Sequence, residues 1–166
     1  MTLEPGKEPA CAAVREADAI QRFFTRPVFL SATIGIPFCI FKLLFGITAF
    51  RLGASAGTAL QVFGGIIVIW ATCDLCMNAS RSLLDLAGKK ASFEFCTLAQ
   101  LGRIFNRPLV FLALDTLITF CIICAMLWLG WITLLDPTEL VLWYTATTLN
   151  LVSLSLVILY NEIRNS

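Results

Sequence analysis

Residues 28–50 read VFLSATIGIPFCIFKLLFGITAF, and this stretch decides the fold. Its one charged side chain is Lys42, and the rest is apolar or weakly polar. About 20 residues, rising ~1.5 Å each, cross a hydrocarbon core of about 30 Å. Three further runs of this kind occupy residues 58–76, 109–134 and 140–160. The sequence therefore predicts an all-α integral membrane protein with four transmembrane helices.

The composition of the whole chain agrees with a membrane protein. Hydrophobic residues make up 58% of the 166 residues, and the mean hydropathy is +0.85. Charged residues make up only 14%, against about 25% in typical soluble domains. The net charge is only +1, so the chain lacks the excess of positive charge that is typical of nucleic-acid-binding proteins. The chain has no His, the commonest proton shuttle and metal ligand. We therefore expect a membrane protein that is not an enzyme and has no cofactor or metal.

The chain is predicted to form a single membrane domain, residues 1–166. It divides into an N-terminal segment (1–27), a first helical hairpin (28–81), a loop (82–108) and a second hairpin (109–166). Acidic residues and the lack of a short apolar run in 1–27 argue against a cleaved signal peptide. Basic residues concentrate on one side of the spans, which places both termini and the long loop in the cytoplasm. Ten of the twelve belong to this side: Lys7, Arg15, Arg22, Arg26, Arg81, Lys89, Lys90, Arg103, Arg107 and Arg164.

An internal duplication is indicated by two matching segments. Residues 22–27, RFFTRP, match residues 103–108, RIFNRP, and the similarity continues into the following span. Spans two and four also both end in Asn-x-x-Arg, at 78–81 and 161–164. Each unit holds two spans, so both copies insert in the same orientation and form two tandem parallel two-helix repeats. We expect residues 22–81 to superpose on 103–164 by a rotation of about 180° around the membrane normal.

Two pairs of arginines mark the membrane boundary of each repeat. Arg22 and Arg26, like Arg103 and Arg107, are spaced i, i+4, which places each pair on one helix face. Such faces are candidate contacts for lipid headgroups, with simple anchoring of the span as the alternative. A short amphipathic helix is predicted before each repeat, lying in the interface or docked on protein. Their apolar stripes are Val14, Ala17, Ile20 and Phe24, and Leu98, Leu101 and Phe105.

Four polar side chains inside the spans are candidate functional residues, because ionisable groups in a membrane are costly. Lys42 lies in the outer half of span one and Asp74 near the cytoplasmic end of span two. Asp115 lies about two turns into span three, and Asn150 lies in the middle of span four. Together they could line a polar path or act as counter-ions for a ligand.

Each charged candidate also has a structural explanation. Lys42 could extend to the outer interface. Asp74 could contact headgroups, Arg81 or Arg26, and Asp115 could pair with Arg107 or an arginine of the first repeat. The different depths of Lys42 and Asp115 predict that these two form no direct pair. Two further features concern packing: Pro37 predicts a kink in span one, and Gly64-Gly65 a close helix contact.

Seven cysteines include two C-x-x-C pairs, at Cys73/Cys76 and Cys121/Cys124. Membrane thiol oxidoreductases that reduce quinones need a further pair in an outer loop. The predicted outer loops, about 51–57 and 135–139, contain no Cys. A zinc site is also disfavoured, because the two pairs lie at different depths. We expect the cysteines to serve as small apolar residues, with redox activity of the two pairs left open.

The resulting functional hypothesis is a non-enzymatic structural or accessory subunit of a larger membrane complex. It requires apolar lateral faces, short outer loops and little chemistry, all of which the sequence offers. One alternative is a small ion or solute channel or transporter that works as an oligomer. A further alternative is a membrane-shaping hairpin protein. The expected partners are the lipid bilayer and other membrane subunits or further copies of this chain.

Overall fold

The computed structural model describes residues 27–89 and 91–165, which are helical apart from short connections and contain no strand. Within these residues four helices are long and apolar enough to cross a membrane, as many as the sequence predicts. In chain order the elements are α2 (Pro27–Leu30), the π-helical turn η1 (Ser31–Gly35), α3 (Ile36–Ala56), α4 (Thr58–Leu86), α5 (Thr97–Ile104), α6 (Pro108–Trp128), the 3-10 turn η2 (Trp131–Leu134) and α7 (Pro137–Asn165).

Several predicted boundaries were wrong. The first span does not end at Phe50, because α3 continues to Ala56 through most of the predicted outer loop 51–57. The second span does not end at Cys76, because α4 continues without interruption to Leu86. The third span ends at Trp128 instead of Leu134, and a 3-10 turn follows it. The fourth begins at Pro137, where a proline suits the first turn because its missing N–H is not needed there. Hydropathy alone could not find these ends, because polar residues occur within the last turns of α4 and apolar residues continue past Trp128.

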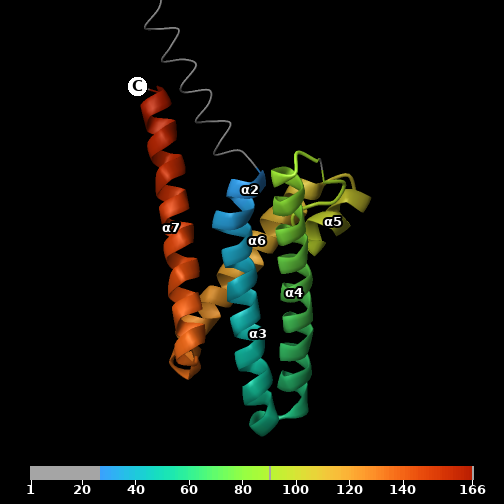
Figure 1. Ribbon diagram of the computed structural model, residues 1–166. Helices are drawn as coiled ribbons and strands as arrows, with labels where there is room; N and C mark the ends of the chain where they lie inside the picture. Colours follow the sequence, from blue (N-terminus) through green and yellow to red (C-terminus); the bar gives the residue numbers. More distant parts are fainter. Residues whose placement is uncertain (1–26, 90, 166) are drawn as a thin grey trace, which may run out of the picture.

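Helix α3 is the centre of the molecule. It packs along α4 and also contacts α6 and α7. Figure 1 shows α3 between α4 and α7, with α6 crossing behind it at an angle. Within the best spanning window of each helix, 56% of α3 is buried, against 22% for α4, 22% for α6 and 17% for α7. Most side chains of the other three spans are therefore exposed or only partly buried.

The two ends of the helical array differ in content. At one end lie α2, α5 and the C-terminal end of α7, and at the other lie the turn after α3 and the turn after α6 (Figure 1). The latter end is tied together by Arg51, whose guanidinium pairs with both carboxylate oxygens of Glu139 and lies 3.5 Å from Asp136. This exposed network joins the end of α3 to the start of α7.

The predicted tandem repeat is not apparent in the helix pairing. Helices α3 and α4 form a closely packed hairpin, whereas α6 and α7 make little direct contact and both contact α3. The first copy of the arginine motif, with Arg22 and Arg26, and the first amphipathic segment lie outside the described residues. The duplication and its two-fold axis therefore stay predictions.

The α3–α4 hairpin is held by a tight turn and a close backbone contact. Gly57 alone separates the helices, with φ of 141°, a value that L side chains rarely adopt. Further along, a Cβ atom on Gly64 would lie 2.4 Å from the backbone nitrogen of Phe50 and 2.7 Å from the carbonyl oxygen of Gly46. This confirms the close helix contact predicted at Gly64 and places it inside the chain. The neighbouring Gly65 has no such contact, because its Cβ would lie 3.7 Å from the Phe50 ring.

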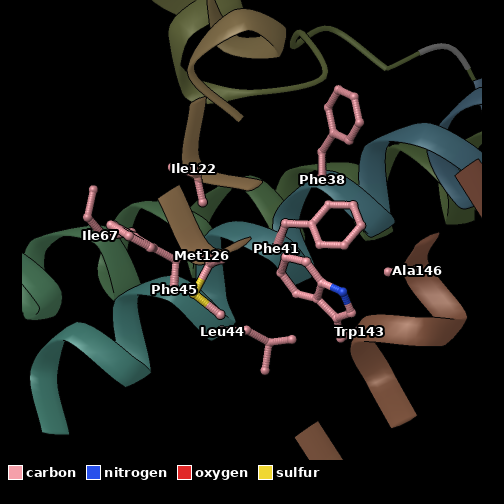
Figure 2. Close-up of a cluster of buried hydrophobic side chains, with 9 residues drawn as sticks. All are labelled: Phe38, Phe41, Leu44, Phe45, Ile67, Ile122, Met126, Trp143 and Ala146. Carbon is pink, nitrogen blue, oxygen red and sulfur yellow. The ribbon is translucent and has the colours of Figure 1, made fainter. Parts of the chain in front are cut away.

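The apolar core surrounds α3. Figure 2 shows Phe41 and Trp143 facing each other between α3 and α7, with ring centroids 4.8 Å apart in an edge-to-face arrangement. Ile122 and Met126 of α6 and Ile67 of α4 complete the cluster from the other sides. Large side chains from all four spans therefore meet on α3, which fixes the positions of the polar residues next to them.

Span one contains a π-helical turn directly before Pro37, and the kink predicted there stays a prediction. Residues Ser31–Gly35 form η1 directly before Ile36 and Pro37. Proline donates no backbone hydrogen bond and its ring crowds the preceding turn, so a wider turn accommodates it. The π turn brings Ser31 and Gly35 against α4, beside the buried charges.

Candidate functional site: a buried ion cluster and its pocket

Three charged side chains meet inside the helical array. The Lys42 ammonium donates to Asp74 Oδ2 at 2.8 Å and to Asp115 Oδ1 at 2.6 Å. All three are buried, with Lys42 only 1% exposed. The cluster joins α3, α4 and α6, and we name Lys42, Asp74 and Asp115 the ion triad.

The direct Lys42–Asp115 pair contradicts the sequence-based expectation. That expectation placed each residue at a membrane depth by counting residues along its span. It assumed that every span runs parallel to the membrane normal. In the structure α6 crosses α3 obliquely (Figure 1), and helical side chains lean towards the N-terminal end of their own helix. The long Lys42 side chain therefore reaches the carboxylates instead of the outer interface. Asp115 faces the protein, as predicted, but its partner is Lys42 and not Arg107.

The second oxygen of Asp74 is held by the start of α5. Asp74 Oδ1 accepts hydrogen bonds from the backbone nitrogen of Thr97 at 2.7 Å and from its hydroxyl at 2.8 Å. The Trp70 indole donates to the same hydroxyl at 2.7 Å, and the Lys42 ammonium lies 4.5 Å from the centroid of the Trp70 ring. Asp74 thus pairs with Lys42 and Thr97, whereas pairing with Arg81 or Arg26 had been one expectation.

A row of polar side chains, Asn78 and Ser31, continues from the ion triad towards η1, and we call it the polar seam. Asn78 donates from its amide to the backbone oxygen of Asp74 at 3.0 Å. The Ser31 hydroxyl lies 2.9 Å from the Asn78 side-chain oxygen and 3.0 Å from its backbone oxygen. A Cβ atom on Gly35 would lie 2.2 Å from the same side-chain oxygen, so the seam requires a glycine there. These polar contacts therefore pack η1 against α4.

A pocket of about 180 Å³ borders the ion triad. Both carboxylates, Asp74 and Asp115, line it together with the amide of Asn78. Much of its remaining lining is apolar and comes from η1, α3, α6 and the connection before α5. The largest of these side chains are Phe38, Phe95 and Leu112. A mostly apolar cavity with a few convergent polar groups is typical of a ligand site.

The connection before α5 is fixed by two arginines. Arg81 donates to the backbone oxygen of Phe93, lies 3.9 Å from Glu94 and places its guanidinium 3.8 Å from the centroid of the Phe95 ring. Arg103 donates to the backbone oxygen of Ser92. These contacts hold Phe95 at the edge of the pocket.

The expectation that Arg103 and Arg107 share one helix face was wrong. Arg103 lies in the last turn of α5, whereas Arg107 precedes α6 with extended φ of −136°. The helix breaks between them because Pro108 disfavours helical conformation in the residue before it. Both side chains are exposed. In α5 the small residues Ala99 and Gly102 face the protein, while Leu101, Ile104 and Phe105 are exposed.

The described cysteines fall into two groups, and all are free thiols. The C-x-x-C residues Cys73, Cys76, Cys121 and Cys124 are exposed on the sides of α4 and α6. Cys39 and Cys96 are buried and line the pocket. No group of three or more metal-binding side chains occurs among residues 27–89 and 91–165.

Cys96 is expected to resist alkylation. Burial raises the pKa of its thiol from 9.0 to about 12, with the nearby Asp115 carboxylate adding to the increase. The thiolate is the reactive form, so at pH 8 we expect labelling by a maleimide to be about a thousandfold slower than at a thiol with the ordinary pKa. The measurement is mass spectrometry of the purified protein in detergent over time. Labelling of Cys96 as fast as that of an exposed cysteine would contradict the buried position.

Asn150 is separate from the ion triad. It lies on α7, on the same helix face as the buried Trp143, Ala146 and Ser153. The sequence analysis missed Thr97, Trp70 and Asn78 as members of the site. Thr97 and Asn78 are polar residues next to or within apolar runs, which is a weak signal. Trp70 lies within an apolar run and carries no charge, so no local pattern marks it.

The fold and the site together define a class: an all-helical protein with four candidate membrane-spanning helices and a buried, hydrogen-bonded ion triad beside a pocket. Comparison with protein-family models, with curated proteins and with solved structures finds no match to this chain.

Proposed function

We propose that the chain is a non-enzymatic, multi-pass membrane protein that acts as a structural or accessory subunit of a larger membrane complex. The ion triad supports this role because it joins α3, α4 and α6 through side chains that satisfy one another. A transport path along Lys42, Asp115 and Asn150 is disfavoured, because Asn150 lies on α7, outside the triad. In this proposal the ion triad stabilises the packing of α3, α4 and α6 and does not carry a transported species.

The observation that carries the proposal is the partly exposed amide of Asn150 on α7. Asn150 forms no side-chain hydrogen bond within the described part of the chain. Polar side chains in a spanning helix favour partners on neighbouring helices, because hydrocarbon offers no hydrogen bonds. Asn150 therefore favours a helix of another subunit beside α7.

The lateral faces of the molecule provide further support. Helix α7 contacts α3 and η1, and only 17% of its best spanning window is buried. Large apolar side chains are exposed along α4, α6 and α7. Lipid or other membrane helices can cover such surfaces, whereas water cannot cover them without cost.

The proposed orientation places both termini in the cytoplasm. The basic residues Arg81, Arg103 and Arg107 lie around α5, at the end of the molecule where α7 also terminates (Figure 1). An excess of Lys and Arg favours the cytoplasmic side. The exposed Leu101, Ile104 and Phe105 of α5 would then lie at the inner interface.

The test is purification from the native membrane in mild detergent, followed by measurement of the particle mass. We expect a complex well above the 18.3 kDa of one chain. Asn150→Leu should reduce recovery of the partner several-fold, because it removes an interhelical hydrogen bond worth about 1 kcal/mol. Thr148→Leu is the matched control, since Thr148 is exposed on a different face of α7.

Two results would contradict the proposal. One is a particle with the mass of a single chain in every mild detergent tried. The other is a selective flux of ions or solute through the pure protein in liposomes that Asp115→Asn abolishes, which would establish the channel or transporter alternative.

A further inference from the structure

The ion triad carries an unbalanced charge. One ammonium, on Lys42, faces two carboxylates, on Asp74 and Asp115. Asp74 is well satisfied, since it accepts from Lys42 and twice from Thr97. Asp115 accepts one hydrogen bond from Lys42, and beyond this the weakly donating Cys96 thiol lies beside it. Asp115 is therefore the carboxylate of the ion triad whose negative charge is less well compensated.

A buried net charge is costly in a low-dielectric environment unless an opposite charge compensates it or the carboxyl takes up a proton. The pocket beside Asp115 can hold that charge. Its volume is about 180 Å³, whereas a single water molecule needs only about 10–15 Å³ of such space. The pocket therefore has room for a molecule larger than one water or one inorganic ion.

The lining of the pocket indicates the chemistry of the molecule. Phe38, Phe95 and Leu112 offer apolar contact, and aromatic faces attract organic cations. An anion is disfavoured because the ammonium of Lys42 is already shared by two carboxylates. A multivalent metal is disfavoured because no group of three metal-binding side chains occurs in the described residues.

We propose that this pocket binds a small organic cation, with its ammonium group paired to Asp115 and its apolar body against Phe38 and Phe95. The site is closed on one side by the connection that carries Phe95, which Arg81 holds in place. This binding activity goes beyond the proposed structural role and does not depend on it. A subunit of this kind would present a ligand site within its complex.

The test uses 2-phenylethylammonium as the probe and the thermal unfolding of the purified full-length protein in detergent as the readout. We expect a saturable increase in Tm of several degrees at millimolar probe, because a ligand that binds only the folded state stabilises it. The neutral analogue 2-phenylethanol, which partitions into micelles in a similar way, should give no saturable shift. Sodium chloride at equal concentration should also give none.

Two variants make the test specific. Asp115→Asn keeps an oxygen for Lys42 and removes the surplus charge, so it should fold and bind the probe at least about tenfold more weakly. Asp85→Asn is the matched control, because it removes a carboxylate at the end of α4 outside the pocket and should leave binding unchanged. Leu112→Phe keeps every charge but fills the pocket, and should also abolish the shift.

Several outcomes would overturn the proposal. The absence of a saturable shift in the unaltered protein, or equal shifts from the neutral analogue, would show that the pocket does not recognise the cation. An equal shift in Asp115→Asn or in Leu112→Phe would place binding elsewhere. An Asp115-dependent shift produced by sodium alone would assign the site to an inorganic ion.

Discussion

Replacing Lys42 with methionine is expected to destabilise the protein by about 3–5 kcal/mol, because it leaves buried carboxylates without their counter-charge. Both Asp74 and Asp115 depend on this ammonium, and all three side chains are nearly inaccessible. Methionine has a similar volume, so the loss reports charge and hydrogen bonding rather than a cavity. The measurement is thermal or denaturant unfolding of the purified protein in one detergent.

The control is a set of variants that remove the carboxylate charges. Adding Asp74→Asn and Asp115→Asn to Lys42→Met should recover a large part of the lost stability, because no uncompensated ion remains. Each carboxamide variant alone should cost less than Lys42→Met. Equal stability of the Lys42→Met variant and the unaltered protein would show that the ion triad does not form.

Substituting Gly64 with alanine is expected to separate the α3–α4 hairpin and to destabilise the protein by about 3 kcal/mol or more. The added Cβ would lie 2.4 Å from the Phe50 nitrogen, and this neighbour is backbone, which can move only if the whole helix moves. The same displacement would pull Lys42 on α3 away from Asp74 on α4. Unfolding in detergent again provides the measurement.

The adjacent Gly65 provides the control for Gly64. A Cβ there would lie at an ordinary contact distance of 3.7 Å from the Phe50 ring. Gly65→Ala should therefore be neutral or slightly stabilising, since alanine favours helix over glycine by about 0.5–1 kcal/mol. Similar losses for the two substitutions would contradict the packing of this hairpin.

Much of the fold could be predicted from the sequence, because the number of spans depends on hydropathy and length. The four apolar runs and the close contact at Gly64 both follow from local composition. The helix ends at Leu86 and Trp128 do not, since apolar residues continue past them or polar residues are tolerated within them. The inclination of α6 depends on packing against α3, which no local pattern encodes.

The site was predicted only in part. Lys42, Asp74 and Asp115 were recognisable because charges are rare inside spans. Their meeting depends on the tilt of α6 and on the direction of the Lys42 side chain, so depth counted along the sequence was misleading. Thr97 and Trp70 carry no charge, and their roles arise only because α5 folds back against α4.

The single-residue turn at Gly57 has a consequence for how the chain enters the bilayer. Because Gly57 alone separates α3 from α4, the two helices leave the ribosome in succession and can insert together as one helical hairpin. Lys42 and Asp74 belong to this hairpin, so these two buried charges can enter the bilayer as a neutralised pair. Asp115 arrives later on α6, with Lys42 already in place to receive it. The order of synthesis thus lets each charge of the ion triad meet a partner soon after it leaves water.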